Sequence, residues 1–385
     1  MQWMNEGADW LLHETCTADA SQPELLAALG AGLAGASART MVGYAEGSDY
    51  ARAAAMTVCG AIAAAGGDAV LVPDCTPVEL GAASGAGECG MILFADETRL
   101  RLYARGLLPV TAEQERLLHQ GGIWQRRTEY GSITDGAALR MLYPAQLAAR
   151  LPAAMTVTPE ISTGSKRLYA LLSRTLPQAQ RGRRRRALSV QLSADGRQAS
   201  VYTEEDGWLF HEKLLMMVTQ HKLSRGEDAA LPYWAAHIAE QMAERSGGRI
   251  LRYAARSDGS DTEARALAAA QGWTLDGTLL LAEVLRIHAE EEPSLHAWAD
   301  RLPPVYTVRR LLHKSENTDA AAGCGTFMQT QKTPDGLRAW DSRGQALLCP
   351  SASGRSIAML VEAATMEAAQ EIAGDIADAV RRADN

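Results

Sequence analysis

An acidic loop directly after an apolar segment is the first place where this sequence offers chemistry. The apolar run GMILF at residues 90–94 is followed by Ala95 and then by Asp96 and Glu97. In a parallel α/β sheet, ligands bind at the carboxyl ends of the strands, so this loop is a natural ligand site. Carboxylates can act as nucleophiles, which makes Asp96 the candidate catalytic residue.

A second polar loop, residues 349–356, reads CPSASGRS and lies between two apolar stretches. Its serines, its glycine and its arginine offer hydroxyl, backbone N–H and guanidinium donors close together in the chain. Such donors suit a phosphate group, so Ser351, Ser353 and Arg355 are candidate phosphate-binding residues. A polar hairpin turn without a ligand is the alternative interpretation.

Three further motifs are explained without a functional site. HEKLL at 211–215 has a leucine where a zinc-protease helix needs its second histidine, which excludes that motif. STGSKR at 162–167 lacks the spacing of a phosphate-binding P-loop, and a helix N-cap at Ser162 or Thr163 explains it. The run RGRRRR at 181–186 is isolated in an acidic protein, which favours a solvated linker over a polynucleotide site.

Composition narrows the class of protein. The 385 residues carry 38 Lys and Arg against 46 Asp and Glu, a formal charge of -8, which argues against a nucleic-acid partner. No run approaches ~20 consecutive apolar residues, so a membrane span is not expected. The six cysteines are scattered without CxxC pairing, which is typical of reduced thiols. We therefore expect a cytoplasmic protein that binds neither nucleic acid nor membrane.

The elements that must position the acidic loop alternate between strands and helices. Thr40–Gly43 and Ala69–Val72 are predicted strands, and between them a helix runs to Ala65 with Ser48 or Asp49 as its N-cap. A strand–helix–strand unit of this kind indicates a parallel sheet with a right-handed crossover. The strand that precedes the acidic loop is expected to extend this sheet.

The remaining elements follow the same kinds of pattern, with a capping box expected from Thr111 to Gln114. Further helices are predicted at 24–36, 77–84, 111–120, 165–176, 208–222, 234–246, 261–271 and 277–290, and strands at 90–94, 187–192, 199–203, 230–234 and 249–254. Residues 303–385 differ in kind, because after a helical or extended lead-in four strands (326–331, 336–341, 345–349 and 356–362) precede one closing helix, Met366 to Arg382. That order suggests a small α+β domain.

These segments, in this order, resemble the α-D-phosphohexomutase superfamily, the phosphoglucomutase and phosphomannomutase enzymes. VGYAEGSDYARAAAMTVCGAIAAAGGDAVLVPDCTP is similar to the family's first crossover, and GMILFADE to its active-serine strand and loop. ALSVQLSADGRQASVYTEEDG is similar to the metal-binding hairpin, and GQALLCPSASGRSIAMLVEAATMEAAQEIA to the fourth domain. The resemblance implies an α/β, multi-domain phosphohexomutase-like fold, with repeated α/β domains, mixed sheets and a small C-terminal α+β domain.

The resemblance also divides the chain into four parts. Residues 1–124 correspond to the first α/β domain, with the degenerate phosphoserine loop. Residues 125–186 are too few for a full second domain, so they form a reduced domain or a connector. Residues 187–302 correspond to the third α/β domain with the metal loop, and residues 303–385 to the C-terminal domain with the phosphate loop.

Enzymes of this family interconvert 1- and 6-phosphosugars with a phosphoserine and a magnesium ion, and this chain departs from them at both. The family's serine falls on Asp96, and the histidine that follows it on Glu97. The metal loop survives as SADGR at 193–197, where Asp195 is the one retained acid. A hard cation needs several oxygen ligands, so we expect no magnesium site and no other cofactor. The family's sugar-recognition loop has no counterpart before Asp276-Gly277.

The losses together predict a phosphoglucomutase/phosphomannomutase-like protein that has lost mutase catalysis. A fixed charge at Asp96 replaces the hydroxyl carrier, and the cation that would offset it is missing. We expect residual phosphosugar or anion binding, or a regulatory role in carbohydrate metabolism through a homo-oligomer or an active mutase partner. Two alternatives stay open: an active mutase or phosphotransferase that uses Asp96 in place of the phosphoserine, and a purely structural interaction module.

Overall fold

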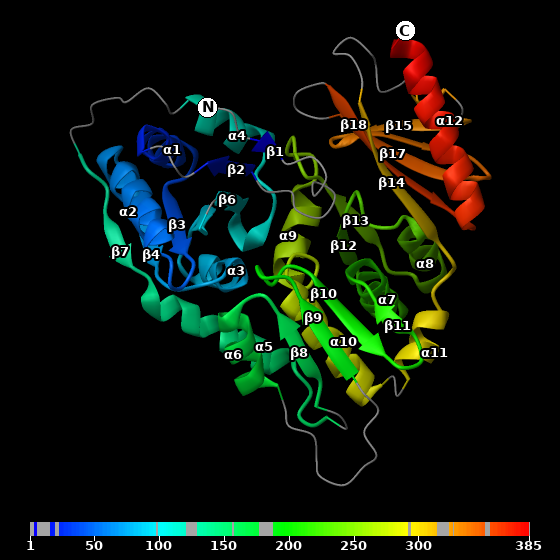
Figure 1. The fold of residues 1–385 in the computed structure, drawn as a ribbon, viewed down its shortest axis with the longest axis horizontal. Coiled ribbons are helices and arrows are strands. Elements are labelled where there is room, and N and C mark those ends of the chain that lie inside the picture. The colour runs from blue at the N-terminus through cyan, green and yellow to red at the C-terminus, as the bar shows by residue number, and fades with distance from the viewer. Residues whose placement is uncertain are drawn as a thin grey trace.

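The computed structural model describes residues 4–5, 16–19, 23–97, 99–120, 129–155, 158–176, 188–291, 294–313, 323–325, 327–350 and 355–384. Within them the strands form four sheets. Figure 1 shows the N-terminal elements in blue and cyan on one side, the C-terminal elements in orange and red on the other, and the green and yellow elements between and below them. No helix among the described residues has the length and apolarity needed to cross a membrane.

The first sheet has seven strands in the order β1-β2-β6-β5-β3-β4-β7. Its strands are β1 (Met4–Asn5), β2 (Cys16–Asp19), β3 (Arg39–Tyr44), β4 (Asp68–Val72), β5 (Met91–Ala95), β6 (Arg99–Ala104) and β7 (Ile133–Asp135). The expected strand–helix–strand unit is confirmed, because β3 pairs in parallel with β4 and β5. The strand β6 was not predicted, and it turns back antiparallel to β5 after the acidic loop.

Helices cover both faces of this sheet. They are α1 (Pro23–Ala36), α2 (Asp49–Ala64), α3 (Pro77–Ala86), the short 3-10 helix η1 (Arg105–Leu107) and α4 (Ala112–Gln120). Two predicted caps are confirmed: Ser48 accepts the N–H of Ala51 at 3.1 Å, and Thr111 and Gln114 exchange side-chain bonds with each other's backbone N–H. These caps satisfy N–H groups that have no partner inside the helix.

The second sheet contains the hairpin whose sequence is similar to the family's metal-binding hairpin. Its order is β11-β10-β9-β8, from strands β8 (Glu160–Thr163), β9 (Leu188–Leu192), β10 (Ala199–Thr203) and β11 (Gly207–Leu209). The predicted helix at 208–222 starts later, at α7 (His211–Ser224), because residues 207–209 pair with β10 instead. The N-cap of α6 (Lys166–Thr175) is Ser165, which accepts the N–H of Leu168, and not Ser162 or Thr163, which lie in β8.

The middle of the chain adds mostly helices. The short parallel pair β12 (Ala229–Pro232) and β13 (Ile250–Tyr253) forms a third sheet. Around the second and third sheets lie the 3-10 helix η2 (Ala137–Met141) and the helices α5 (Leu142–Arg150), α8 (Ile238–Ser246), α9 (Thr262–Gln271), α10 (Gly277–Glu290) and α11 (Leu295–Asp300). Residues 125–186 thus contribute β7 to the first sheet and β8 to the second.

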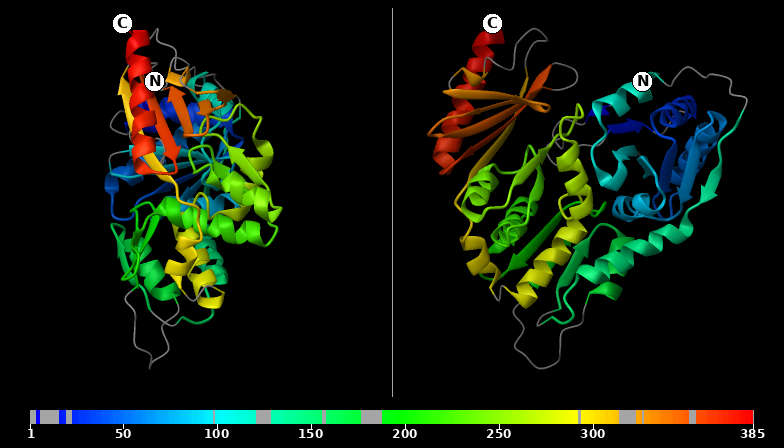
Figure 2. Two further views of the ribbon diagram at one scale, coloured as in Figure 1. Left: turned by 90° about the vertical axis from the view of Figure 1, so that its right-hand side faces the viewer. Right: turned by 180° about the vertical axis from the view of Figure 1, so that it is seen from behind.

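The C-terminal unit is an antiparallel sheet with one long helix. Its order is β14-β18-β17-β16-β15, from β14 (Tyr306–His313), β15 (Gln329–Thr333), β16 (Gly336–Trp340), β17 (Gly344–Pro350) and β18 (Ser356–Ala363). The helix α12 (Met366–Asp384) buries Ile372 and Ile376 against Val361 and Leu348 of the sheet. Figure 2 shows this unit and the N-terminal unit, which is the first sheet with the helices that cover it, on either side of the middle elements.

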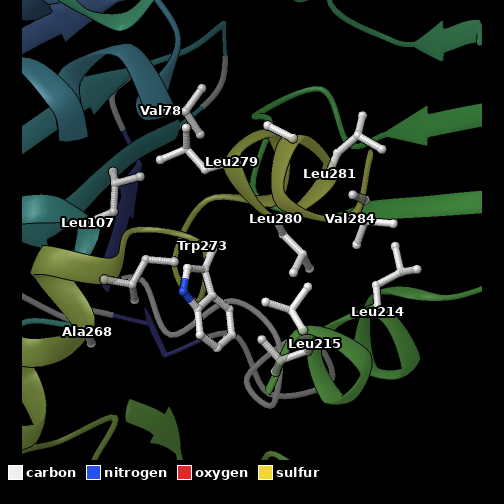
Figure 3. Close-up of a cluster of buried hydrophobic side chains, with 14 of the residues drawn as sticks. Val78, Leu107, Leu214, Leu215, Ala268, Trp273, Leu279, Leu280, Leu281 and Val284 are labelled. Atoms are coloured by element: carbon white, nitrogen blue, oxygen red, sulfur yellow. The ribbon is translucent and has the colours of Figure 1, made fainter. Parts of the chain in front are cut away.

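One buried apolar cluster ties the first sheet to the middle elements. Val78 of α3 and Leu107 of η1 belong to it, together with Trp273 in the segment before α10 and Leu279 in the first turn of α10. Figure 3 shows Val78 next to Leu279 at the top, and Leu215 of α7 and Leu280 of α10 between the Trp273 ring and Leu214. Burial of each large apolar side chain stabilises the fold by about 1.5–3 kcal/mol, so this junction fixes how the loops of the two units face each other.

Candidate functional site

The acidic loop and the β9–β10 hairpin come together at one side chain, Arg101 of β6. Its Nη2 lies 3.3 Å from Oδ2 of Asp96, and its Nη1 lies 4.0 Å from Oδ2 of Asp195. The Arg101 and Asp96 side chains are each one-quarter exposed, and the Asp195 side chain is 11 % exposed. The structure therefore joins the loops that correspond to the phosphoserine and metal loops of the resembled family.

The acidic loop is a tight turn closed by its own aspartate. The backbone N–H of Asp96 donates to the Arg99 carbonyl at 2.9 Å, and the N–H of Arg99 donates to Oδ1 of Asp96 at 2.8 Å. An aspartate that accepts a nearby backbone N–H in this way favours a turn. Both carboxylate oxygens of Asp96 thus have a donor or a cation nearby, while Glu97 is exposed.

The β9–β10 hairpin is also closed by its aspartate. Oδ1 of Asp195 accepts the Ser193 hydroxyl at 2.6 Å and the Arg197 N–H at 3.1 Å. Gly196 has a φ of +79°, and a Cβ there would lie 2.9 Å from the Val78 side chain on α3. Glycine therefore lets the turn form and lets it pack against the N-terminal unit.

A second arginine, Arg197 of the β9–β10 hairpin, extends towards β6 at the same junction. The Arg197 guanidinium lies 5.2 Å from the centre of the Tyr103 ring on β6, within the range of a cation–π contact. Nε and Nη1 of Arg197 and the hydroxyl oxygen of Tyr103 are buried, and within the part of the chain that the structure describes their geometry gives none of them a regular hydrogen bond. Burial raises the pKa of the Tyr103 hydroxyl, so it stays neutral.

The residues present do not fit a magnesium ion. Mg²⁺ prefers octahedral coordination by oxygen ligands, and carboxylates are its usual protein ligands. In the hairpin Asp195 is the one acid, and its oxygens already contact Ser193, Arg197 and Arg101. Among the described residues, no three His, Cys, Asp or Glu side chains are grouped so that they could hold a metal ion.

The segment before α10 has no counterpart of the family's sugar-recognition loop, and it belongs to the core. Trp273 is 1 % exposed, and Asp276 caps α10 by accepting the N–H groups of Thr278 and Leu279 at 2.8 and 3.0 Å. Oδ2 of Asp276 also accepts the Tyr143 hydroxyl at 2.8 Å. Burial raises the pKa of the Asp276 carboxyl to about 7.

The predicted phosphate loop is described only at its ends. Ser351 and Ser353 lie outside the described residues, as does the arginine run at 181–186. Arg355 is exposed and lies directly before β18. Phosphate binding at this loop therefore stays a prediction.

Sequence reasoning missed Arg101, although a signal was present. The segment RLRLYA at 99–104 alternates polar and apolar residues, which is typical of a strand with two different faces. On β6, Arg101 and Tyr103 share one face because side chains two residues apart in a strand point the same way. That face meets the β9–β10 hairpin, while Leu100 and Leu102 face the core formed with α1 and α2.

Comparison with known proteins gives matches at the level of structure only. No family model matches the sequence, and no curated protein matches it. A phosphoglucomutase/phosphomannomutase family protein from Burkholderia thailandensis superposes with a TM-score of 0.72 at 15% identity, covering 97% of both chains. The phosphoglucomutase parafusin from Paramecium, in its open form, gives 0.57 at 8% identity, covering 98% of this chain and 93% of its own.

A provisionally assigned phosphomannomutase from Thermus thermophilus lies between them, with a TM-score of 0.63 at 14% identity and coverage of 94% of this chain and 98% of its own. These matches run over nearly the whole chain, so they include all four sheets and the junction between them. The chain has the multi-domain mixed α/β fold of phosphoglucomutase/phosphomannomutase structures.

Proposed function

We propose that this chain is a phosphohexomutase-like protein that has lost the mutase reaction and keeps a binding role in carbohydrate metabolism. The observation that carries the proposal is the state of Asp96, which stands at the family's phosphoserine position. Its Oδ1 accepts a backbone N–H and its Oδ2 faces the Arg101 guanidinium. A carboxylate whose two oxygens are engaged by a backbone N–H and a guanidinium, and which closes a turn, is poorly placed to attack phosphorus.

The surroundings of Asp96 support the same conclusion. Phosphoryl transfer depends on a positioned nucleophile and on cations that neutralise charge developing on the transferred group. Arg101 is the nearby cation, and it is shared between Asp96 and Asp195. An incoming phosphate would have to displace these carboxylates from Arg101 while meeting their negative charge.

The proposed ligand is a phosphosugar or another phosphate-bearing anion at the loop of residues 349–356. Arg355 is exposed, and in the sequence it follows the predicted donors Ser351 and Ser353. A guanidinium can bind a phosphate through two parallel hydrogen bonds. If this loop binds no anion, the proposed role is partner binding, with an active mutase or a second copy of this chain as the partner.

A mutase assay tests the catalytic half of the proposal. The purified chain is incubated with glucose-1-phosphate, mannose-1-phosphate or glucosamine-1-phosphate, with magnesium and the matching bisphosphate activator. We expect no conversion, whereas an active phosphoglucomutase in parallel converts its substrate. Turnover at ordinary enzymatic rates that disappears in Asp96→Asn but not in Glu88→Gln, an exposed acid before β5, would instead support the aspartyl-phosphate alternative.

A thermal-shift titration tests the binding half. A phosphosugar at about 100 times its Kd stabilises the folded state by about 2.7 kcal/mol, which is readily measured. We expect Arg355→Ala to abolish the shift and Arg381→Ala, an exposed arginine on α12 of the same unit, to keep it. A wild-type chain that shows no shift with any phosphosugar or with inorganic phosphate, but copurifies with a partner, would favour the purely structural alternative.

A further inference from the structure

One guanidinium holds two carboxylates that come from different sheets. Arg101 lies on β6 of the first sheet, within 3.3 Å of Asp96 in the preceding loop and 4.0 Å of Asp195 in the hairpin of the second sheet. We propose that Arg101 is a built-in cation that takes the place of a divalent metal ion between Asp96 and Asp195, and so offsets the negative charge where the acidic loop meets the β9–β10 hairpin.

The oxygen donors around Arg101 are of the kind that a hard cation would choose. Carboxylate oxygens of Asp96 and Asp195 face the guanidinium, and the Ser193 hydroxyl lies 2.6 Å from the other oxygen of Asp195. Hydroxyl and carboxylate oxygens are ligands for Mg²⁺ and Ca²⁺ in proteins. A fixed arginine among them supplies positive charge without a bound ion.

Two arginines reach across the junction in opposite directions. Arg101 faces Asp195 from β6, and Arg197 lies over the Tyr103 ring from the hairpin, so each unit places one arginine against the other. Two guanidinium groups therefore accompany the two carboxylates Asp96 and Asp195. Removal of Arg101 would leave both carboxylates without the cation that they share.

Packing keeps the two loops at this separation whether or not the arginine is present. Gly196 of the hairpin rests against Val78 of α3, and its carbonyl accepts the N–H of Thr278 at 3.1 Å. The two aspartates are thus held by contacts that do not involve Arg101. A variant without the arginine should keep the carboxylates in place and so gain affinity for a divalent cation.

The test is cation-dependent stability in Arg101→Ala. Thermal unfolding is followed while MgCl₂ or CaCl₂ is raised to millimolar concentrations, with NaCl at matched ionic strength as the reference. We expect the wild-type Tm to respond equally to the divalent and monovalent salts. The Arg101→Ala variant should have a lower Tm, which the divalent cations raise by about 2 °C or more over NaCl.

Matched variants separate a built cation site from a general charge effect. Arg105→Ala removes an exposed arginine just beyond β6 and should behave like the wild type. Arg101→Ala combined with Asp195→Asn should lose the response to divalent cations, because one of the two ligands is gone. If Arg101→Ala does not fold, Arg101→Gln keeps the side chain as far as Cδ and a polar end without the charge, and is tested in the same way.

Two results would overturn the proposal. One is a divalent response in the wild type as large as in Arg101→Ala, which would mean that the arginine does not take a cation's place. The other is a folded Arg101→Ala or Arg101→Gln protein that responds to MgCl₂ no more than to NaCl. Neither result depends on whether the chain binds a phosphosugar or carries out catalysis.

Discussion

At the scale of single residues, the chain buries ionisable groups in structural positions. Asp276 is 3 % exposed, yet it accepts two backbone N–H groups of α10 and the hydroxyl of Tyr143 on α5. Burial raises the pKa of its carboxyl from 3.8 to about 7, so the folded state binds a proton that the unfolded chain releases near pH 4. Its contribution to stability is therefore greatest in acid and is lost as the pH rises through about 7.

The fall in stability with rising pH can be tested with Asp276→Asn. Asparagine still caps α10 through its carbonyl oxygen but cannot ionise. The free energy of unfolding of Asp276→Asn should therefore fall less than that of the wild type between pH 5.5 and pH 8.5. Each pKa unit corresponds to about 1.4 kcal/mol, and the range from pH 5.5 to the folded pKa spans about 1.5 units, so the difference should reach about 2 kcal/mol. Urea unfolding at the two pH values measures it, and parallel pH profiles for the two proteins would contradict the raised pKa.

At the scale of elements, the start of α10 is packed directly against the β9–β10 hairpin. A Cβ on Gly277 would lie 2.5 Å from the backbone carbon of Gln198 and 2.7 Å from that of Arg197. At such distances a Cβ would clash with backbone atoms, which cannot move without shifting the hairpin. The hairpin must stay close to α10 for Asp195 to face Arg101. The position of α10 thus helps to set the geometry of the candidate site.

Gly277→Ala should therefore destabilise the fold by about 1–3 kcal/mol, as overpacking of a core does. The matched control is Gly60→Ala in α2, where a Cβ meets nothing within 4 Å. That change should be neutral or stabilising by up to about 1 kcal/mol, because alanine is the better helix former. Denaturant unfolding compares them, and equal free energies of unfolding for the two variants would disprove close packing at Gly277.

At the scale of the whole molecule, the C-terminal sheet is joined to the middle elements by the partly buried carboxylate of Asp335 and the buried carboxylate of Glu362. Asp335 accepts the N–H groups of Ala255 and Arg256, just after β13, at 3.0 and 3.1 Å. Glu362 of β18 accepts the N–H of His237 at 3.0 Å. These bonds satisfy backbone groups across the boundary, so the C-terminal unit is held by polar contacts.

Asp335→Ala should loosen this junction selectively. The two N–H groups that it leaves without an acceptor cost about 1–3 kcal/mol, and amide hydrogen exchange at residues 255 and 256 should accelerate by at least tenfold. The control is Asp341→Ala, whose carboxylate pairs with Arg343 in its own hairpin and should leave that exchange unchanged. Unaltered exchange in Asp335→Ala would show that other contacts hold the unit.

Local patterns in the sequence determined most of the elements that position the site. Alternating strand residues, the Ser48 cap and the box at Thr111 depend on neighbours a few positions away, and the structure confirms them. The short strand β11 was taken as the start of a helix, because its pairing with β10 outweighs local helix propensity. The strands β7 and β8 also escaped prediction, since each is a short edge strand with little internal pattern.

In the candidate site, too, some residues could be predicted from the sequence and others could not. The sequence alone located Asp96 after a strand and Asp195 in a turn, because both positions follow from local pattern and family resemblance. Only the tertiary structure showed that Arg101 lies between them. That contact depends on how α3, α10 and the hairpin pack together, and such packing sums many apolar contacts between residues far apart in the chain, which no local pattern encodes.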